Sequence, residues 1–261
     1  MEAPLESAIG KALYATKFIN HTNKNVFLTG KAGTGKTTFL KQIVSNTYKK
    51  CLIVAPTGIA AINAGGSTIH SLFQLPFGTF VPVAQNKDNF NDRVKLNDPS
   101  TVIKNLQMFD NKRKLLRELE LLIIDEVSML RADLLDAIDL VLRHVRRRHN
   151  ISFGGVQVLF IGDLLQLPPV IKNEEWEILR NYYKSAYFFD SKVLQENKPV
   201  YIELDKIYRQ SDERFILLLN HLRDNAITQE DNVLLNTFYK PEFKPNSSDN
   251  YITLTTHNNK A

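Results

Sequence analysis

The stretch VFLTGKAGTGKTTFL, residues 26–40, constrains the fold of this chain more than any other. An apolar run stops at Gly30, and residues 30–37 match the pattern G-x-x-x-x-G-K-[ST]. Glycines let successive backbone N–H groups turn inward around an anion, because no Cβ blocks the approach. A helix beginning near Lys36 would point the positive end of its dipole at the same place. The stretch predicts a phosphate-binding loop between a buried strand and a helix; an ordinary structural turn is the alternative.

Four apolar runs predict the fold class: NVFLT (25–29), CLIVA (51–55), LLIID (121–125) and VQVLFIGD (156–163). They are nearly uninterrupted rather than alternating, which is typical of strands buried on both faces of a parallel sheet. Between the last two runs, apolar residues recur at the spacing of one helix face, with Asp and Arg on the other. These are Leu134, Leu135, Ile138, Val141, Leu142 and Val145. We therefore predict a three-layer α/β fold with a mainly parallel sheet.

Two regions depart from this alternation. Residues 76–100 carry prolines, Asn and Asp, and we interpret them as a surface excursion that is long enough to be functional. After about residue 205 the pattern changes again. A helix face formed by Phe215, Leu218, Leu219 and Leu222 is followed by the polar segment KPEFKPNSSDN (240–250) and by YITLTTHNNKA (251–261). We expect a main domain over 1–205, a small helical and linker region over 206–250, and the first strand of a second domain over 251–261.

Bulk properties narrow the class of protein. The formal charge is +5 and the pI is about 9.1, a mild basic excess that is compatible with a polyanionic partner without requiring one. Cys51 is the single cysteine, so no internal disulfide can form and a reducing compartment is expected. The first residues do not resemble a secretory signal, and no apolar run approaches the length that crosses a bilayer. We expect a soluble protein with no membrane partner, cytoplasmic in a prokaryote and nuclear or mitochondrial in a eukaryote.

Candidate nucleotide-binding residues surround the predicted loop. Lys36 can reach the β- and γ-phosphates of a triphosphate, and Thr37 can place its hydroxyl on Mg²⁺. Asp125 follows the apolar run LLII, at the end of a strand where a carboxylate can hold Mg²⁺, and Glu126 can polarise an attacking water. An ordinary helix start is the alternative for this acidic pair. The complete set of nucleotide-binding candidates is Gly30, Lys31, Ala32, Gly33, Thr34, Gly35, Lys36, Thr37 and Thr38.

A third strand, in VLFIGDLLQLPPV (158–170), ends in Gly-Asp, with Gln166 three residues beyond Asp163. A neutral amide at Gln166 can sense a γ-phosphate or a water without titrating. We expect Asp163 to orient the loop. A solvated Gln166 after an ordinary strand exit is the alternative.

Five ordered motifs resemble those of the Pif family of superfamily-1B DNA helicases, with the RecD-type helicases as the nearest relatives. They are TGKAGTGKT, VAPTGIAAINAGGSTIHS (54–71), IIDEVSML, FGGVQVLFIGDLLQLPPV (153–170) and KIYRQSD (206–212). The resemblance extends from about residue 20 to about residue 225. It implies a RecA-like motor that uses ATP and Mg²⁺ to move 5′ to 3′ along single-stranded DNA and to open duplex or forked DNA in genome maintenance. It is also expected to act as a monomer.

The resemblance assigns roles to further residues. Thr57 and Gly58 match a motif that contacts the DNA backbone, and His70 and Ser71 match a second DNA-contacting segment. Gln166 matches the residue that couples the ATP state to DNA binding, and Arg209 matches an arginine that stabilises charge on the γ-phosphate. Without the resemblance, Thr57 could be a plain helix cap, His70 a packed histidine and Arg209 a surface charge.

Two functional alternatives remain open at this point. Another P-loop ATPase, such as a clamp-loader-like switch or an RNA helicase, would keep the phosphate loop and the acidic pair. A non-enzymatic nucleotide-binding module is the other. We also expect the 261-residue chain alone to bind nucleotide weakly and not to unwind DNA processively. The segment RHVRRRHN (143–150) has two interpretations, a DNA-binding patch or a solvated helix end.

Overall fold

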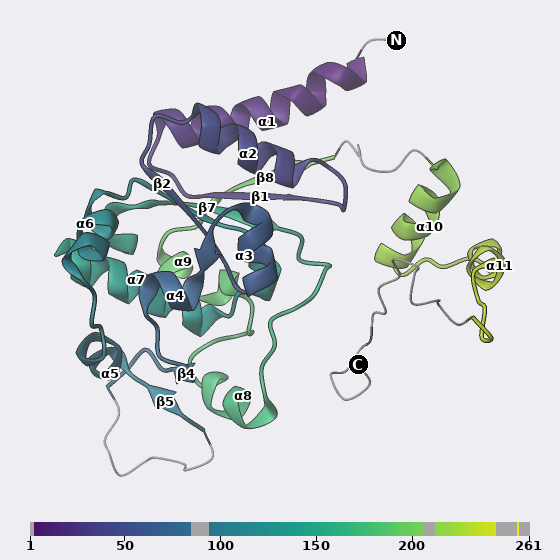
Figure 1. Cartoon of the computed structure of the whole chain (residues 1–261). Coiled ribbons are helices and arrows are strands. Elements are labelled where there is room, and N and C mark those ends of the chain that lie inside the picture. The colour runs from purple at the N-terminus through teal and green to yellow at the C-terminus, as the bar shows by residue number, and fades with distance from the viewer. Residues whose placement is uncertain (1–2, 85–93, 206–211, 244–254, 256–261) are drawn as a thin grey trace. The chain divides into compact units, whose positions relative to one another are not determined.

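The computed structural model describes residues 3–84, 94–205, 212–243 and 255 (Figure 1). The chain divides into two compact units, Met1–Gln210 and Ser211–Ala261, which are described separately. Within the described residues, no helix is both long and apolar enough to span a bilayer.

A six-stranded sheet forms the centre of the larger unit, and all its neighbouring strands are parallel. Its strands, in order across the sheet, are β3 (Ser67–Thr68), β2 (Cys51–Ala55), β6 (Leu121–Ile124), β7 (Gln157–Gly162), β1 (Val26–Gly30) and β8 (Val200–Leu204). Every residue of β1, β6 and β7 is buried, which agrees with the uninterrupted apolar runs of these strands. The four predicted strands are therefore present, and β3 and β8 are additional.

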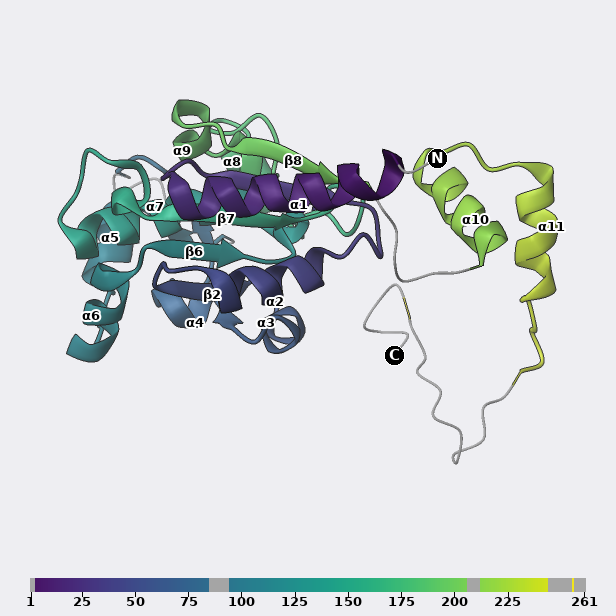
Figure 2. The same cartoon turned by 90° about the horizontal axis from the view of Figure 1, so that it is seen from above.

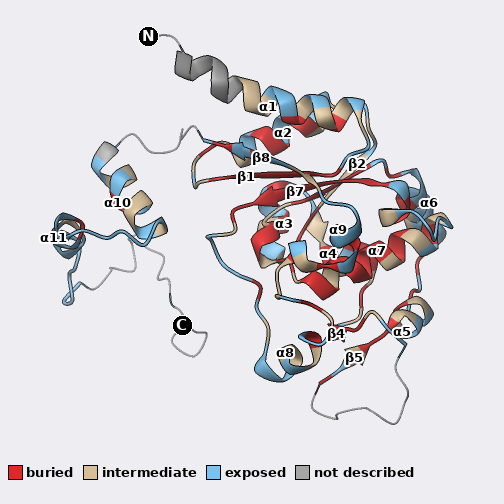
Figure 3. Cartoon of the chain, turned by 180° about the vertical axis from the view of Figure 1, so that it is seen from behind, coloured by how far each residue is buried: buried red, intermediate tan, exposed pale blue. Residues whose placement is uncertain are grey.

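Helices cover both faces of the sheet and complete the three predicted layers. Leu121 and Ile123 of β6 face a core shared with α1 (Ala3–His21) and α2 (Lys36–Asn46). Leu122 and Ile124 face the opposite core, which α7 (Ala132–Arg146) dominates. Figure 2 shows α1 and α2 along the sheet, and Figure 3 shows buried strands together with helices that combine buried and exposed residues.

Shorter elements complete this unit. The α-helices are α3 (Gly58–Ala64), α4 (Ile69–Phe73), α5 (Pro99–Lys104), α6 (Asp110–Glu118), α8 (Asn173–Leu179) and α9 (Lys192–Glu196). The 3₁₀ helices are η2 (Val127–Met129), η3 (Ser152–Gly155) and η4 (Phe188–Asp190). A second, two-stranded parallel sheet pairs β4 (Thr79–Phe80) with β5 (Leu96–Asn97).

The predicted surface excursion at 76–100 is only partly at the surface. Phe80, Val81 and Asn97 are buried, and Phe80 N–H donates to Asp133 Oδ2 of α7 at 3.0 Å. The two ends of the excursion are thus tied to each other through β4 and β5 and to the main core through α7. Polar composition alone did not indicate this, because the burial depends on a partner more than 50 residues away.

The polar side of α7 contains buried aspartates. Asp133 accepts from Phe80 N–H, Asp136 from Lys192 and Val193 N–H at 3.0 Å each, and Asp139 from Phe153 N–H. Each aspartate therefore satisfies backbone donors of a different segment. The regular apolar face of α7 was predicted correctly, whereas these anchoring contacts on its other face were not.

In the smaller unit, α10 (Glu213–Arg223) and α11 (Gln229–Thr237) form a helix pair. Asp231 of α11 accepts from Thr228 N–H at 2.8 Å and lies 2.7 Å from His221 Nδ1 of α10. This contact joins the start of α11 to the last turn of α10. The predicted helix face Phe215, Leu218, Leu219 and Leu222 lies on α10, with Leu218 buried. Residues 251–254 and 256–261 of the predicted second-domain strand are outside the described residues.

Candidate functional site

The glycine-rich loop leaves the carboxyl end of β1 and leads directly into α2. Gly33 and Gly35 have φ of 79° and 88°, left-handed values that side chains with a Cβ rarely adopt. At Gly30, an added Cβ would lie 2.5 Å from both Leu204 O and Thr34 Oγ1. Glycine is thus required at these positions for the backbone to bend as it does. The strand–loop–helix context predicted for a phosphate-binding loop is present.

The start of α2 is suited to an anion. Its N-cap, Gly35, provides no side-chain cap, and no acidic residue lies in the first turn. Lys36 turns back into the loop, where its Nζ donates to Gly30 O at 2.6 Å and to Lys31 O at 3.1 Å. Thr37 and Thr38 are exposed beside it. Uncapped N–H groups, a helix dipole and an ammonium group at one point fit the phosphates of a nucleotide.

An acidic pair follows β6. Asp125 N–H donates to Val54 O of the neighbouring β2 at 2.9 Å, which continues the sheet by one residue. Burial raises the pKa of Asp125; the adjacent Glu126 N–H and the nearby Lys36 act in the opposite direction. Glu126 itself has a left-handed backbone, φ 50°, at the start of η2. The coupling between Lys36 and Asp125 shows that the loop and the acidic pair are neighbours.

Asp163 and Gln166 follow β7. Asp163 is buried, and its carboxylate accepts from Leu165 N–H at 3.2 Å and from Gln166 Nε2 at 3.1 Å. The expectation that Asp163 orients the loop agrees with these contacts. Leu165, Gln166 and Leu167 are exposed. Because β6, β7 and β1 are adjacent parallel strands, their following loops meet at one edge of the sheet, where ligands bind in open α/β folds.

The two predicted DNA-contacting segments begin at helix N-termini. Thr57 caps α3 by accepting from Ala60 N–H at 3.3 Å, so the alternative assignment as a helix cap is structurally real. Gly58 is exposed, and an added Cβ there would meet nothing within 4 Å. Ser71 N–H donates to the Thr68 cap of α4, and Ser71 is exposed. Both segments therefore present small residues and backbone to solvent.

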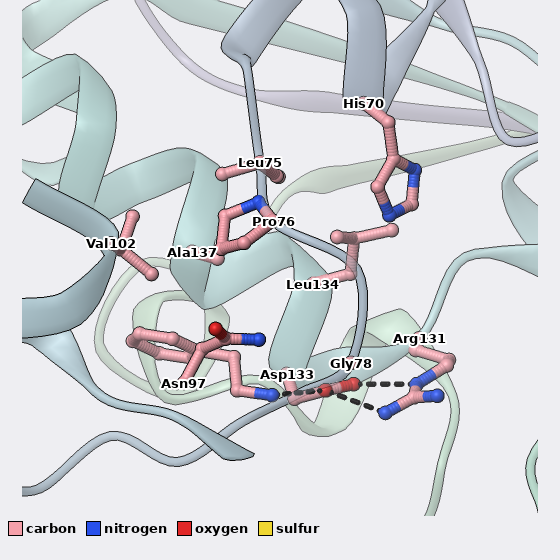
Figure 4. A pocket seen from close by; sticks show the side chains of 11 residues that line it. His70, Leu75, Pro76, Gly78, Asn97, Val102, Arg131, Asp133, Leu134 and Ala137 are labelled. Atoms are coloured by element: carbon pink, nitrogen blue, oxygen red, sulfur yellow. Dashed lines mark hydrogen bonds and ion pairs between the residues drawn. The ribbon is translucent and has the colours of Figure 1, made fainter. Parts of the chain in front are cut away.

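His70 is half-buried beside a pocket that also reaches Arg131 and Asp133 (Figure 4). Its ring stacks on Phe77, with centroids 5.2 Å apart and planes 20° apart, and Phe77 is 76% exposed. Burial, reinforced by Arg131 and opposed by Asp133, lowers the pKa of His70. His70 is thus partly a packed histidine, as the alternative predicted, but the ring on which it packs, Phe77, is exposed to solvent.

Two neighbours of this region had no signal in the sequence. Lys112 of α6 donates from Nζ to Ser71 O at 2.6 Å, a contact across 41 positions. Phe77 is one of three phenylalanines in the predicted excursion, and nothing in the sequence distinguishes it from the other two. Arg209, the predicted γ-phosphate arginine, lies outside the described residues.

The parallel sheet with helices on both faces and a glycine-rich loop at the end of β1 define a RecA-like P-loop fold. The family model for PIF1-like helicase matches residues 7–233. The chain therefore belongs to the PIF1-like helicase family, as its motifs predicted.

Individual relatives support the same family assignment. The chain is 35% identical over 213 residues to the ATP-dependent DNA helicase PIF1 of Homo sapiens, a match covering 79% of this chain and 28% of that protein. The chain is 34% identical over 212 residues to the ATP-dependent DNA helicase PIF1 of Saccharomyces cerevisiae (strain YJM789), a match covering 79% of this chain and 22% of that protein. The chain thus spans about a quarter of the length of these curated relatives.

Solved structures are similar over nearly the whole chain. Bacteroides Pif1 bound to ssDNA has a TM-score of 0.81 at 42% identity, covering 96% of this chain and 53% of that one. Pif1 from Bacteroides in complex with ADP-AlF3 and ssDNA has a TM-score of 0.82 at 41% identity, and the match covers 96% of this chain and 54% of that one. This chain therefore corresponds to about half of each solved chain.

Proposed function

We propose that this chain is the first ATP-binding lobe of a DNA helicase that moves 5′ to 3′ on single-stranded DNA and opens duplex and forked DNA in genome maintenance. One observation carries the proposal. The glycine-rich loop, the acidic pair after β6 and the caps of α3 all follow strands of one sheet at its carboxyl edge. Nucleotide and DNA contacts would then share a rigid frame, which a motor needs. The relatives named ATP-dependent DNA helicase add support.

The loop residues bind the nucleotide in this proposal. Backbone N–H groups from Gly33 to Thr38 surround the phosphates of ATP, and Lys36 exchanges its loop carbonyls for β- and γ-phosphate oxygens. Thr37 and Asp125 are the residues that would hold Mg²⁺, which neutralises charge on the phosphates when bound. A raised pKa at Asp125 fits this role, because a buried carboxylate is stabilised by a nearby cation.

Hydrolysis requires a water that attacks the γ-phosphorus while the bond to the β–γ bridging oxygen breaks. Glu126 accepts the proton of that water, and Lys36 offsets negative charge on the transferred group. Gln166, attached to Asp163, senses the γ-phosphate and links it to the loop after β7. Arg209 would add a second positive charge, as the family resemblance implies.

In this proposal, the exposed segments at the start of α3 and α4 contact DNA. Thr57 and Gly58 offer a hydroxyl and an accessible backbone to one phosphate, and Ser71 with its neighbour His70 offers a second contact. In this proposal residues 1–205 form the motor domain, 206–250 a helical and linker region, and 251–261 the first residues of a second RecA-like domain. The protein acts as a monomer, in the cytoplasm of a prokaryote or in the nucleus or mitochondria of a eukaryote.

Equilibrium binding tests the proposal. A fluorescent ATP analogue with Mg²⁺, single-stranded DNA and single-stranded RNA of the same sequence would be titrated into the 261-residue chain and into Lys36→Ala. We expect Lys36→Ala to weaken analogue binding at least about tenfold, from loss of one charged contact, and to leave DNA binding and the thermal midpoint unchanged. Equal analogue binding by both proteins would contradict the proposal. Preference for RNA over DNA would favour an RNA helicase.

A further inference from the structure

The α6 helix and the carboxyl end of α7 carry exposed basic side chains that the proposed function does not use. We call them the α6–α7 basic strip: Arg113, Lys114, Arg117, His144, Arg147, Arg148 and His149. The second half of the strip is the segment RHVRRRHN, for which the sequence left a DNA patch and a solvated helix end as alternatives. The contacts around the strip distinguish the two.

Arg146 donates to several carbonyl groups at the junction of the two helices. Its Nη1 donates to the carbonyl oxygens of Leu116, Arg117 and Leu119 at 2.9, 2.7 and 2.8 Å, and its Nε donates to Gly154 O at 2.8 Å. Arg117 Nε returns a bond to Val145 O at 3.1 Å. Four hydrogen bonds from two arginines thus fix the ends of α6 and α7 against each other, and a fifth joins α7 to η3.

Most charges of the strip have no acidic partner among the described residues; Lys114, which acts on Glu118, is the exception. His144 and His149 have ring centroids 6.4 Å apart, and Arg113 lies close enough to His144 to help lower its pKa, after burial and His149. Nearby acids have other partners as well: Glu118 pairs with Lys50 at 2.9 Å, Glu120 accepts from Lys50 N–H at 2.9 Å, and Asp139 pairs with Arg143 at 2.7 Å. Among residues 94–205, Arg113 has no ion pair, and neither do Arg147 and Arg148. Held cations that repel one another destabilise a fold unless a polyanion binds them.

The strip starts where the predicted DNA segment ends. Lys112 precedes Arg113 on α6, and its Nζ donates to Ser71 O at 2.6 Å. Lys112 connects Ser71 to α6, and α7 packs beside α6 (Figure 1). Arg113 of α6 is near enough to His144, at the end of α7, to help lower its pKa. DNA that touches Ser71 would therefore lie beside Lys112 and near the exposed Arg113 and Lys114 of α6.

We infer that the α6–α7 basic strip binds the phosphodiester backbone of DNA that extends beyond the α4 segment. This inference rests on the proposed function and gives it a second DNA contact surface. Arginine and lysine contacts to phosphates carry no sequence information, and apart from its two histidines the strip contains no aromatic ring on which a base could stack. Binding there is sequence-independent and sensitive to salt.

The test compares two triple variants of the 261-residue chain with equal loss of charge. Arg113→Gln/Lys114→Gln/Arg148→Gln removes three cations of the strip. Lys17→Gln/Lys24→Gln/Lys41→Gln removes three exposed cations from the region of α1 and α2. Each protein is titrated by fluorescence anisotropy with an oligonucleotide of about six nucleotides, one of about 20, and the short one joined to a duplex. Titrations are repeated at several salt concentrations.

We expect the strip variant to bind the short oligonucleotide like the parent and to lose about 10- to 100-fold in affinity for one of the extended ligands. Its salt slope should fall by about 2 if three single-strand phosphates are lost and by nearly 3 if they belong to a duplex. Loss on the long single strand assigns that backbone to the strip, and loss on the tailed duplex assigns the duplex. Equal affinity of parent and strip variant for both extended ligands, or equal losses in the two variants, would overturn the inference. If the parent binds no DNA at all, the proposed function itself fails.

Discussion

Carboxylates occupy two regions of the larger unit and have opposite surroundings. On α7, Asp133 and Asp136 are buried and accept hydrogen bonds from the backbone of distant segments. At the carboxyl edge of the sheet, Asp125 and Glu126 are half-buried at the end of β6. Among the described residues, the groups that act on the desolvated Asp125 are the neighbouring Glu126 N–H and the charges of Glu126 and Lys36.

The difference separates anchoring from function. A carboxylate that satisfies several backbone donors stabilises the fold, and its removal leaves those donors buried and unpaired. A carboxylate that is desolvated without such partners costs stability, and a fold that keeps one there gains something other than stability from it. The following substitutions test this contrast, from the largest expected effect to the smallest.

Glu126→Gln should affect chemistry most. If Glu126 accepts the proton of the attacking water, ATP hydrolysis should fall by about 10²- to 10⁴-fold while binding of the ATP analogue changes little. The rate is measured with protein in excess over radiolabelled ATP, so that slow turnover is detectable. Glu174→Gln, an exposed acid on α8, is the matched control. Hydrolysis at the parental rate in Glu126→Gln would remove this residue from the site.

Asp133→Asn should affect stability instead. Asp133 is buried, and it pairs with the half-buried Arg131 at 2.8 Å (Figure 4). It also accepts from Phe80 N–H, and Arg131 lies 3.4 Å from a second acid, Glu175. Asn at this position removes the closer acidic partner of Arg131 and weakens the acceptor for Phe80 N–H, so the free energy of unfolding should fall by about 3 kcal/mol in urea titrations. Glu177→Gln, which removes only the exposed pair with Arg180, should change it little. Matching values for the two variants would refute the anchoring role.

Asp136 connects stability to pH. Burial raises its pKa from 3.8 to about 6, although it accepts hydrogen bonds from Tyr183, Lys192 and Val193. The folded state therefore holds a proton that the unfolded state releases between pH 4 and 6, and stability falls as pH rises through this window. The full contribution is about 3 kcal/mol at most. Asp136→Asn should lack this part of the pH dependence in urea unfolding at pH 4.5 and 6.5. Parallel pH profiles of the variant and the parent would argue against it.

Thr57→Ala should have the smallest effect on stability and binding. It distinguishes a role of Thr57 as a helix cap from an additional role in DNA contact. Loss of the cap on α3 should cost about 1 kcal/mol of stability. If Thr57 also contacts DNA, affinity for single-stranded DNA should fall several-fold as well. Thr57→Ser keeps a hydroxyl and should restore both properties. A variant that loses stability but binds DNA normally would leave Thr57 as a cap only.

Local patterns predicted the strands and the loop, because both are encoded in consecutive residues. The apolar runs match β1, β2, β6 and β7 to within one residue at each end, and α2 begins at Lys36 as expected. β8 was not predicted because only Ile202 and Leu204 are buried in this edge strand, which gives it no uninterrupted apolar run. The order of strands depends on pairing between distant segments, which no local pattern contains.

The candidate nucleotide and DNA site follows the same rule: its local motifs were predicted and its long-range contacts were not. The phosphate loop and the acidic pair are local motifs, whereas the stacking of His70 on Phe77 and the bond from Lys112 to Ser71 join segments through tertiary packing. The aspartates of α7 show the same limit. Their spacing is that of an ordinary polar helix face, and they are buried because distant segments pack against this face.

Hydrogen exchange of the backbone amides, with and without a non-hydrolysable ATP analogue and Mg²⁺, tests the central claim most directly. Exchange slows where N–H groups become bonded, so the account predicts protection concentrated in residues 31–38, with a smaller effect around Asp125. Lys36→Ala should lose this protection. Protection in another part of the chain, with residues 31–38 unchanged at saturating analogue, would contradict a nucleotide site at the end of β1.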